Sequence, residues 1–259
     1  MKRALLAIGD VQTYGYQHDA VSHSLAQIER LGRESDIYDT WIRTDTQLLT
    51  KGALHLPYAT VRNVRSLDDF DAVFLFTAGE PLMSGQQRAD LLSFIRDDGK
   101  GLVGAHSATT TFYSWPEFGD LLGGYFDCHP WEVFDAPVIV EDPSFPAMRH
   151  FKPAFTIRDE IYQMRAPYSR DKVHVLASLD SAKLDFSSSK PHRPDRDYPV
   201  AWAKTEGKGR VFYSTFGHTV EAWDNRDVQS MYLEAIKWAM GITSAPLTPH
   251  PAARKLECG

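Results

Sequence analysis

Five residues of this chain have side chains suited to metal binding and proton transfer, and all are expected at one edge of a predicted sheet. Four are histidines, His18, His106, His129 and His218, and the fifth is Glu160. Imidazole titrates near neutral pH and is the commonest metal ligand, and three protein ligands with one open position suit a catalytic Zn²⁺ ion. Each histidine taken alone could instead cap a turn. Their convergence predicts a divalent metal site, with Zn²⁺ as the suspected ion.

The turn around His106 has the pattern of a nucleophile elbow without its nucleophile. The short apolar run Leu102-Val103 leads into Gly104-Ala105-His106-Ser107-Ala108, which is typical of a buried strand that ends in a sharp turn. The central position of such a turn would carry Ser or Cys in an enzyme that forms an acyl-enzyme. An imidazole there is better suited to metal binding, proton transfer or oxyanion stabilisation.

The first half of the chain predicts the elements that would position these residues. Strands are expected at Lys2 to Ile8 and Ala72 to Thr77, and helices at Ala20 to Leu31, with Gly32 as its stop, and at Ser84 to Asp97, with Ser84 as N-cap. Strand and helix alternate three times, which favours a doubly wound parallel sheet. Ligands bind such sheets outside the carboxyl ends of the strands, so the loops carrying His18 and His106 belong on one edge.

The second half predicts further strands and a closing helix. β-like segments lie at 35–39, 136–140 and 173–179, and strand alternation would place Glu160 and Tyr162 on one side of the stretch 155–162. Gly207-Lys208-Gly209 indicates a hairpin, and a helix is expected over 227–240. The polar segment 181–199 is expected to be a surface loop that could fold over the site. We expect one domain over residues 1–243, followed by a Pro-rich tail, 244–259, that is disordered or draped over the molecule.

Composition narrows the classes of partner. The chain has 259 residues, is 43% hydrophobic and carries a formal charge of −6, which leaves no basic footprint for nucleic acid. The first apolar run, Ala4 to Ile8, is too short for a signal sequence or membrane span, so we expect a cytoplasmic protein without a membrane partner. The two cysteines, Cys128 and Cys258, cannot build a disulfide framework or a thiolate cage. A homo-oligomer is also expected.

The chain resembles the ThuA-like family, the trehalose-utilisation proteins that share the class I glutamine amidotransferase-like, flavodoxin-type fold. The resemblance spans nearly the whole sequence and depends on several motifs in order: His18-Asp19, Gly101 to His106, Gly123 to Phe126 with His129-Pro130-Trp131, Asp142-Pro143, Asp159 to Tyr162, Pro199 to Trp202, Gly207 to Tyr213 and Gly217-His218-Thr219. It implies an α/β, flavodoxin-like three-layer sandwich with a mainly parallel sheet.

The resemblance also implies carbohydrate catabolism, because family members are linked to disaccharides oxidised to a ketone at sugar carbon 3. It implies loss of amidotransferase chemistry, since the elbow lacks a thiol and Cys128 lies outside that turn. We expect a hydrolase or lyase that cleaves keto-sugar glycosides (3-keto-disaccharides or 3-keto-glucosides) by elimination and hydration. Its expected ligands are a small-molecule sugar and a divalent ion, with no nucleotide cofactor.

Such a reaction needs a base for the proton on carbon 2, an electrophile for the oxyanion and an acid for the leaving group. We expect His18, His106 and Glu160 to be the catalytic residues. We expect His106, His129 and His218 to bind the metal or to stabilise the oxyanion. The allocation of the acid and base roles between Glu160 and His18 stays open.

Three residues are expected to bind substrate. Trp131 and Tyr162 could stack on a sugar ring, although aromatic residues lie more often in a core, and Asp19 could bind substrate or cap the next helix. Tyr14 and Tyr16 stand where the family often has small residues, which is expected to alter substrate choice.

Two other function classes remain open. The missing elbow nucleophile also fits a non-catalytic sugar-binding or scaffolding protein on an amidotransferase-like fold. A His-rich metal site would equally suit a general metal hydrolase acting on an ester or amide.

Overall fold

Nine strands form one sheet in the order β2-β1-β5-β6-β13-β12-β11-β8-β9 in the computed structural model, which describes residues 2–52, 55–56, 59–60, 65–188 and 190–249. The sheet strands are β1 Arg3–Ile8, β2 Tyr38–Arg43, β5 Ala72–Leu75, β6 Gly101–Ala105, β8 Val133–Val140, β9 Ala154–Glu160, β11 His174–Leu179, β12 Pro199–Glu206 and β13 Gly209–Ser214. Two small sheets pair β3 His55–Leu56 with β4 Ala59–Thr60, and β7 Tyr125–Cys128 with β10 Gln163–Arg165.

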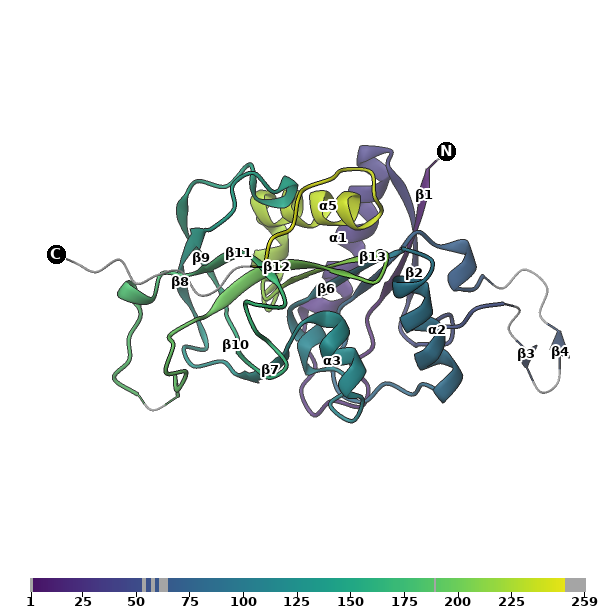
Figure 1. Cartoon of the computed structure of the whole chain (residues 1–259), viewed down its shortest axis with the longest axis horizontal. Helices are drawn as coiled ribbons and strands as arrows, with labels where there is room; N and C mark the ends of the chain where they lie inside the picture. Colours follow the sequence, from purple (N-terminus) through teal and green to yellow (C-terminus); the bar gives the residue numbers. More distant parts are fainter. Residues whose placement is uncertain (1, 53–54, 57–58, 61–64, 189, 250–259) are drawn as a thin grey trace.

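The helices cover both faces of the large sheet (Figure 1). They are α1 Ala20–Ser35, α2 Gly85–Arg96, α3 Pro116–Leu122, α4 Val220–Asp224 and α5 Arg226–Ala239. Short 3-10 helices are η1 Leu67–Asp69, η2 His106–Thr110, η3 Pro146–Met148 and η4 Ser181–Lys183. Among the helices of the described residues, none combines the length and the apolar character needed to cross a membrane.

Strand direction decides which chain segments meet at one edge. β2, β1, β5, β6 and β13 are parallel neighbours, whereas β12, β11, β8 and β9 continue the sheet in antiparallel steps. β11 and β9 therefore point the same way as β13, and only β12 and β8 run against them. The expected three-layer sandwich with a mainly parallel sheet is confirmed, with an antiparallel half that the alternation of the first half did not indicate.

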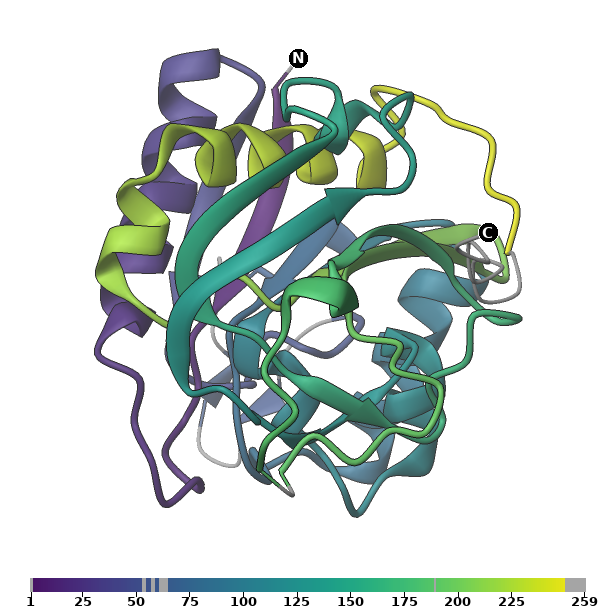
Figure 2. The ribbon, with the colours of Figure 1, turned by 90° about the vertical axis from the view of Figure 1, so that its left-hand side faces the viewer.

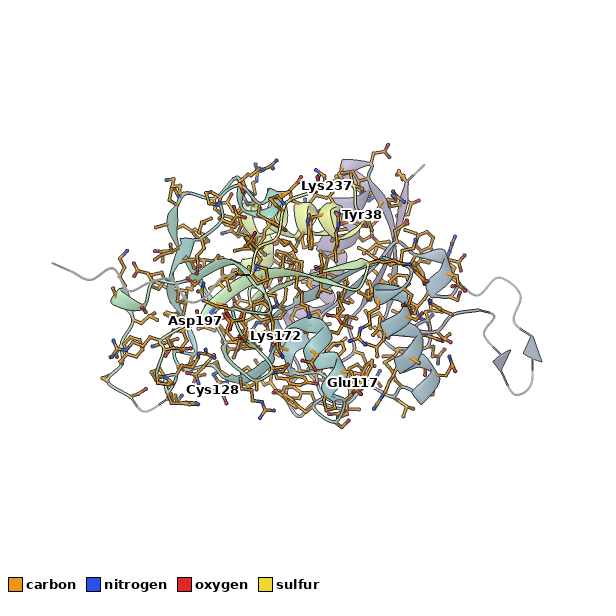
Figure 3. All side chains as sticks on the ribbon, viewed as in Figure 1. Tyr38, Glu117, Cys128, Lys172, Asp197 and Lys237 are labelled. Atoms are coloured by element: carbon orange, nitrogen blue, oxygen red, sulfur yellow. The ribbon has the colours of Figure 1, made fainter. Side chains whose placement is uncertain are left out.

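Two apolar layers hold the sheet between the helices. In β1, Leu5 packs on the side of α1 and α5, whereas Leu6 packs on the side of α2 and α3. Figure 3 shows the three layers, with Lys237 of α5 on one side of the sheet and Glu117 of α3 on the other. Burial on both faces explains why β1 and β5 read as continuous apolar runs.

Local signals explain most helix boundaries, with Gly32 as an exception. Ser84 caps α2 in a capping box with Gln87, as expected. The expected stop at Gly32 is wrong, because α1 continues to Ser35 and ends at Asp36, which adopts φ +59°. Gly32 is instead a contact position, where an added Cβ would collide with the ring of Tyr38. The strand expected at 35–39 consequently begins later, at Tyr38.

The antiparallel half curls back toward the centre of the sheet. The predicted hairpin is present as β12 and β13, and β8 and β9, the last two strands of the same sheet, lie toward the viewer in Figure 2. Ala136 of β8 and Ile157 of β9 join the same apolar cluster as Trp238 of α5. At the end of the described chain, the N–H of Thr248 donates to Nδ1 of His174 over 2.9 Å and Leu247 packs on this cluster. Residues 250–259 of the predicted tail lie outside the described residues.

Candidate active site

Four strand ends bring their functional side chains to one edge of the sheet. His18 lies in the loop after β1, His106 directly follows β6, His218 follows β13, and Glu160 is the last residue of β9. Because these strands point the same way, their carboxyl ends share an edge. One donor atom from each of the four residues lies within 4.8 Å of the others. The edge therefore carries three imidazoles and one carboxylate in contact range.

His106 is held at the base of the site in a strained turn. Its φ is +42° and its side chain is fully buried. Nδ1 lies 2.7 Å from the backbone oxygen of Thr215, an atom that can only accept, so Nδ1 carries the hydrogen. The lone pair of Nε2 then faces the hydroxyl of Tyr162 at 2.7 Å and Nδ1 of His218 at 3.1 Å. The elbow presents one imidazole nitrogen as an acceptor or ligand.

Glu160 and His218 form the second half of the group. Oε2 of Glu160 lies 3.2 Å from Nδ1 of His218 and 3.6 Å from Nε2 of His106. The neighbouring Asp159 is fully buried and accepts the backbone N–H groups of Gly217 and His218, over 2.7 and 3.1 Å. Burial raises the pKa of Asp159 to about 7. Consecutive residues of β9 therefore hold the His218 turn and supply the site with its carboxylate.

The three histidines have different pKa values because their surroundings differ. Burial, followed by the charge of His218, lowers the pKa of His18 to about 4, and burial lowers the pKa of His106 well below its usual range. Burial also opposes the charged form of His218, but its hydrogen bond to Glu160 and the charge of Glu160 outweigh it and raise the pKa. His18 and His106 are neutral at pH 7. Nδ1 of His18 is buried and has no hydrogen-bond partner among the described residues.

A pocket of about 420 Å³ opens beside this group. This volume is within the range of small-molecule sites. The ring of Tyr16 is parallel to that of His218, with centroids 6.1 Å apart. The pocket is lined by Tyr14, Tyr16, His18, Phe126, His129, Glu132, Val133, Glu160, Tyr162 and His218. The aromatic rings can stack on a polyhydroxylated ring, and the carboxylates and imidazoles can transfer protons to and from it.

Comparison with known proteins decides the family. The family model described as ThuA, trehalose utilisation, matches residues 11–239. The chain belongs to this family. Its fold is shared with a ThuA-like protein from Parabacteroides merdae, which is 16% identical with a TM-score of 0.70, over 96% of this chain and 94% of that chain.

A second ThuA-like protein, from Bacteroides uniformis, is 20% identical with a TM-score of 0.67, over 92% of this chain and 91% of that one. A glutamine amidotransferase from Thermotoga maritima is 12% identical with a TM-score of 0.51, over 93% and 99% of the two chains. These likenesses show the amidotransferase-like fold expected from the sequence. No curated protein matches the chain.

In this ThuA-family protein, the expected metal set of His106, His129 and His218 is not assembled as one group. His18 stands with His106 and His218, whereas His129 groups with Glu132 and Glu160. His129 precedes β8, whose first residue, Val133, pairs with Glu160 of β9. Its Nδ1 lies 3.6 Å from Oε1 of Glu160, across the carboxylate from the other histidines.

The three expected substrate-binding residues have different places. Tyr162 lines the pocket. Trp131 does not: its indole N–H donates to the backbone oxygen of Asp185 over 2.8 Å, and its ring contacts Phe134 and Tyr198. Asp19 is exposed at the N-terminus of α1, outside the pocket lining, and its side chain makes no cap hydrogen bond.

Several residues of the site were not assigned a role from the sequence, although Phe126 and Asp159 lie within motifs that carry the family resemblance. Phe126 and Glu132 line the pocket, and Asp159 and Thr215 hold its histidines. Asp159 stands next to Glu160 in a β-like stretch, so alternation alone would have pointed it away from the site. Tyr14 and Tyr16, which depart from the family pattern, also line the pocket. Their departure from that pattern was the sequence signal that pointed to them.

Proposed function

We propose that this ThuA-family protein is a carbohydrate-catabolic enzyme that cleaves keto-sugar glycosides at the pocket beside His106. Family membership supports a carbohydrate-related function. The observation that carries the proposal is the convergence of His18, His106, His218 and Glu160, three of which line a pocket with aromatic walls while His106 is buried beside them. The imidazole at the elbow favours this reaction over amidotransfer, which requires a nucleophile there.

The donor set fits a divalent ion. Nε2 of His106 has its lone pair directed at the group because Nδ1 donates to the backbone oxygen of Thr215. Nδ1 of His18 is buried and has no hydrogen-bond partner in the described part of the chain. Three imidazoles, from His18, His106 and His218, would hold Zn²⁺ and leave a position open. When bound, the ion would polarise the sugar carbonyl at carbon 3 and make the proton on carbon 2 more acidic.

Glu160 and His129 are placed to move protons in an elimination. Oε1 of Glu160 faces the pocket on the side of His129, away from the other histidines. Glu160 takes the proton from carbon 2, the bond from carbon 1 to the aglycone oxygen breaks, and carbons 1 and 2 become doubly bonded. His129, at the open side of the pocket, passes a proton to the aglycone oxygen. Addition of water across the double bond completes a net hydrolysis.

The test is a product assay on 3-keto-trehalose and a panel of 3-keto-glucosides. We expect the wild-type protein to release the aglycone, and chelator to abolish release until Zn²⁺ is restored. Glu160→Gln should lower turnover at least 100-fold, because it removes the base while keeping a side chain of similar size. His150→Gln is the matched control, since His150 is exposed and bonds only the backbone of Asp227 among the interactions of the described residues.

Two outcomes would change the proposal. Binding of these sugars without any release of aglycone would favour the sugar-binding alternative. If Glu160→Gln released the aglycone at the wild-type rate, the reaction would not take place at this site.

A further inference from the structure

A second cavity, of about 380 Å³, borders the candidate active site and shares Phe126 and His129 with it. The other residues that line it are Asp127, Cys128, Lys190 and His192. A carboxylate oxygen of Asp127, the sulfur of Cys128 and a ring nitrogen of His192 lie within 4.8 Å of one another. Thiolate, imidazole and carboxylate together are donors that Zn²⁺ accepts, with a fourth position left for water.

A β-bulge turns two consecutive side chains toward this cavity. Where β7 pairs with β10, Cys128 is opposite Gln163 and Phe126 is opposite Met164, so Asp127 is the extra residue. In a regular strand, neighbouring side chains point to opposite faces, and a bulge re-aims one of them. The irregularity in β7 thus allows Asp127 and Cys128 to serve one site.

The imidazole of His192 is placed between two acceptors. Its Nδ1 lies 2.7 Å from the backbone oxygen of Lys190, and its Nε2 lies 2.8 Å from Oδ2 of Asp127. The carbonyl can only accept, so Nδ1 carries a hydrogen, and a neutral ring then directs the lone pair of Nε2 at a carboxylate. The side-chain N–H₂ of Gln163 lies 2.9 Å from this Nε2 and donates to it, and a cation between the ring and the carboxylate would replace that donor.

A buried amide fixes this arrangement. Gln163 is fully buried, and its Nε2 donates to Oδ2 of Asp127 over 2.7 Å. Its Oε1 accepts the backbone N–H of His192 over 3.1 Å and that of Arg193 over 3.3 Å. One side chain therefore orients a carboxylate from β7 and the loop that carries the imidazole, as partners behind metal ligands do.

We propose that Asp127, Cys128 and His192 bind a Zn²⁺ ion that clamps the loop between η4 and β12 onto β7. This site is separate from the His-rich group and does not depend on the reaction proposed above. The Cys128 thiol donates to the backbone oxygen of Lys190 over 3.7 Å, so it carries its hydrogen before the ion arrives. Binding forms a bond from zinc to sulfur, breaks the S–H bond and releases the proton to solvent.

The test uses full-length Cys258→Ser protein, in which Cys128 is the sole cysteine. Co²⁺ replaces Zn²⁺ as probe, because thiolate ligation gives a charge-transfer absorption that an all-histidine site lacks. We expect this band to saturate with Co²⁺ and to be displaced by Zn²⁺. A further Cys128→Ser change should abolish it, whereas Asp127→Asn or His192→Gln should weaken Co²⁺ affinity at least tenfold. His150→Gln should leave it unchanged.

A second measurement does not require cobalt. Zn²⁺ should slow alkylation of Cys128 by iodoacetamide at least tenfold in the Cys258→Ser protein, but not after Asp127→Asn and His192→Gln are combined. Absence of the band together with unchanged alkylation would overturn the proposal. So would a band of equal affinity in the Asp127 and His192 variants, because the thiol alone would then be the ligand. Neither outcome bears on cleavage of keto-sugars.

Discussion

At the scale of single residues, the geometry of the site depends on the groups that hold its imidazoles in place. His106 is locked in one tautomer by the backbone oxygen of Thr215, and Asp159 fixes the turn of His218 through two backbone N–H groups. Both supports are fully buried. Substituting a support should therefore impair the chemistry without altering the donor set.

Tyr162→Phe tests this view. The variant removes the hydroxyl that donates to Nε2 of His106 over 2.7 Å, and a bound Zn²⁺ would need the same lone pair, so we expect Zn²⁺ affinity to be retained or to rise. Turnover of the keto-sugar should fall about 10- to 100-fold, because Tyr162 lines the pocket and helps to position the reacting groups. The melting temperature should fall by only about 2–4 °C, because one hydrogen bond contributes about 1 kcal/mol. Steady-state kinetics, metal competition and thermal unfolding provide the three readings.

Tyr198→Phe is the matched control for this variant. Tyr198 is also fully buried, but its hydroxyl has no partner among the described residues and lies outside the pocket lining. It should retain wild-type turnover. Equal losses in the two variants would mean that Tyr162 acts through general stability.

The sequence could predict the four clustered residues because His18, His106 and His218 follow strands and Glu160 ends one, and these strand ends meet at one edge. It could not predict side-chain direction. Trp131 has a suitable ring for a sugar but packs against Phe134. His129 faces Oε1 of Glu160, whereas His106 and His218 face Oε2. Those placements depend on how β8 and β9 curl, for which the chain near them carries no local signal.

At the scale of elements, glycine in a helix has two different meanings in this chain. Gly32 is buried inside α1 and faces the ring of Tyr38, whereas Gly85 begins α2 with nothing within 4 Å of an added Cβ. Helices often end just before a glycine, so a helix pattern followed by glycine predicts a helix end. Only the position of Tyr38, after the helix, shows that Gly32 is a packing contact.

Gly32→Ala should destabilise the protein by roughly 1–3 kcal/mol, because the new methyl group forces Tyr38 or the helix to move. Gly85→Ala is its control and should be neutral or stabilise by about 0.4–1 kcal/mol, since alanine restricts the unfolded chain more than glycine does. Urea unfolding of both variants gives the comparison. A neutral Gly32→Ala would show that the contact can relax.

Asp71 joins three central strands at their amino ends and predicts a pH dependence. It accepts the N–H of Ala4 over 3.0 Å and the ammonium of Lys100 over 3.1 Å. Partial burial works to raise the pKa of Asp71, but these two partners outweigh it and the pKa is lowered. The stabilisation is therefore fully present above the ordinary Asp pKa and is lost as the pH falls through the lowered value.

Asp71→Asn should lower the melting temperature at pH 7 by roughly 3–6 °C, equivalent to about 1.5 kcal/mol. The difference from wild type should shrink below about pH 4, where the unfolded carboxyl is protonated. Asp135→Asn, at an exposed ion pair 3.6 Å from Arg158, should show little difference at either pH. A pH-independent loss in Asp71→Asn would assign the effect to shape rather than charge.

At the scale of the whole molecule, the two apolar layers share one sheet, which predicts that they unfold together. Trp202 lies in the layer with α2 and α3, and Trp238 lies in the layer with α5. In Trp202→Phe and Trp238→Phe, unfolding followed by fluorescence and by far-ultraviolet circular dichroism should coincide. Separate transitions would contradict the prediction that residues 1–243 form a single domain.

The antiparallel half places Glu160 on β9, the outermost strand of the described sheet, whereas His106 follows the central strand β6. Edge strands open more readily than central ones, so their amides exchange with deuterated solvent faster. A sugar that contacts both Glu160 and His106 would link the edge strand β9 to the inner strand β6. Its binding should slow deuterium uptake along 154–160 far more than along 72–75, and exchange measured segment by segment would record occupancy even without turnover.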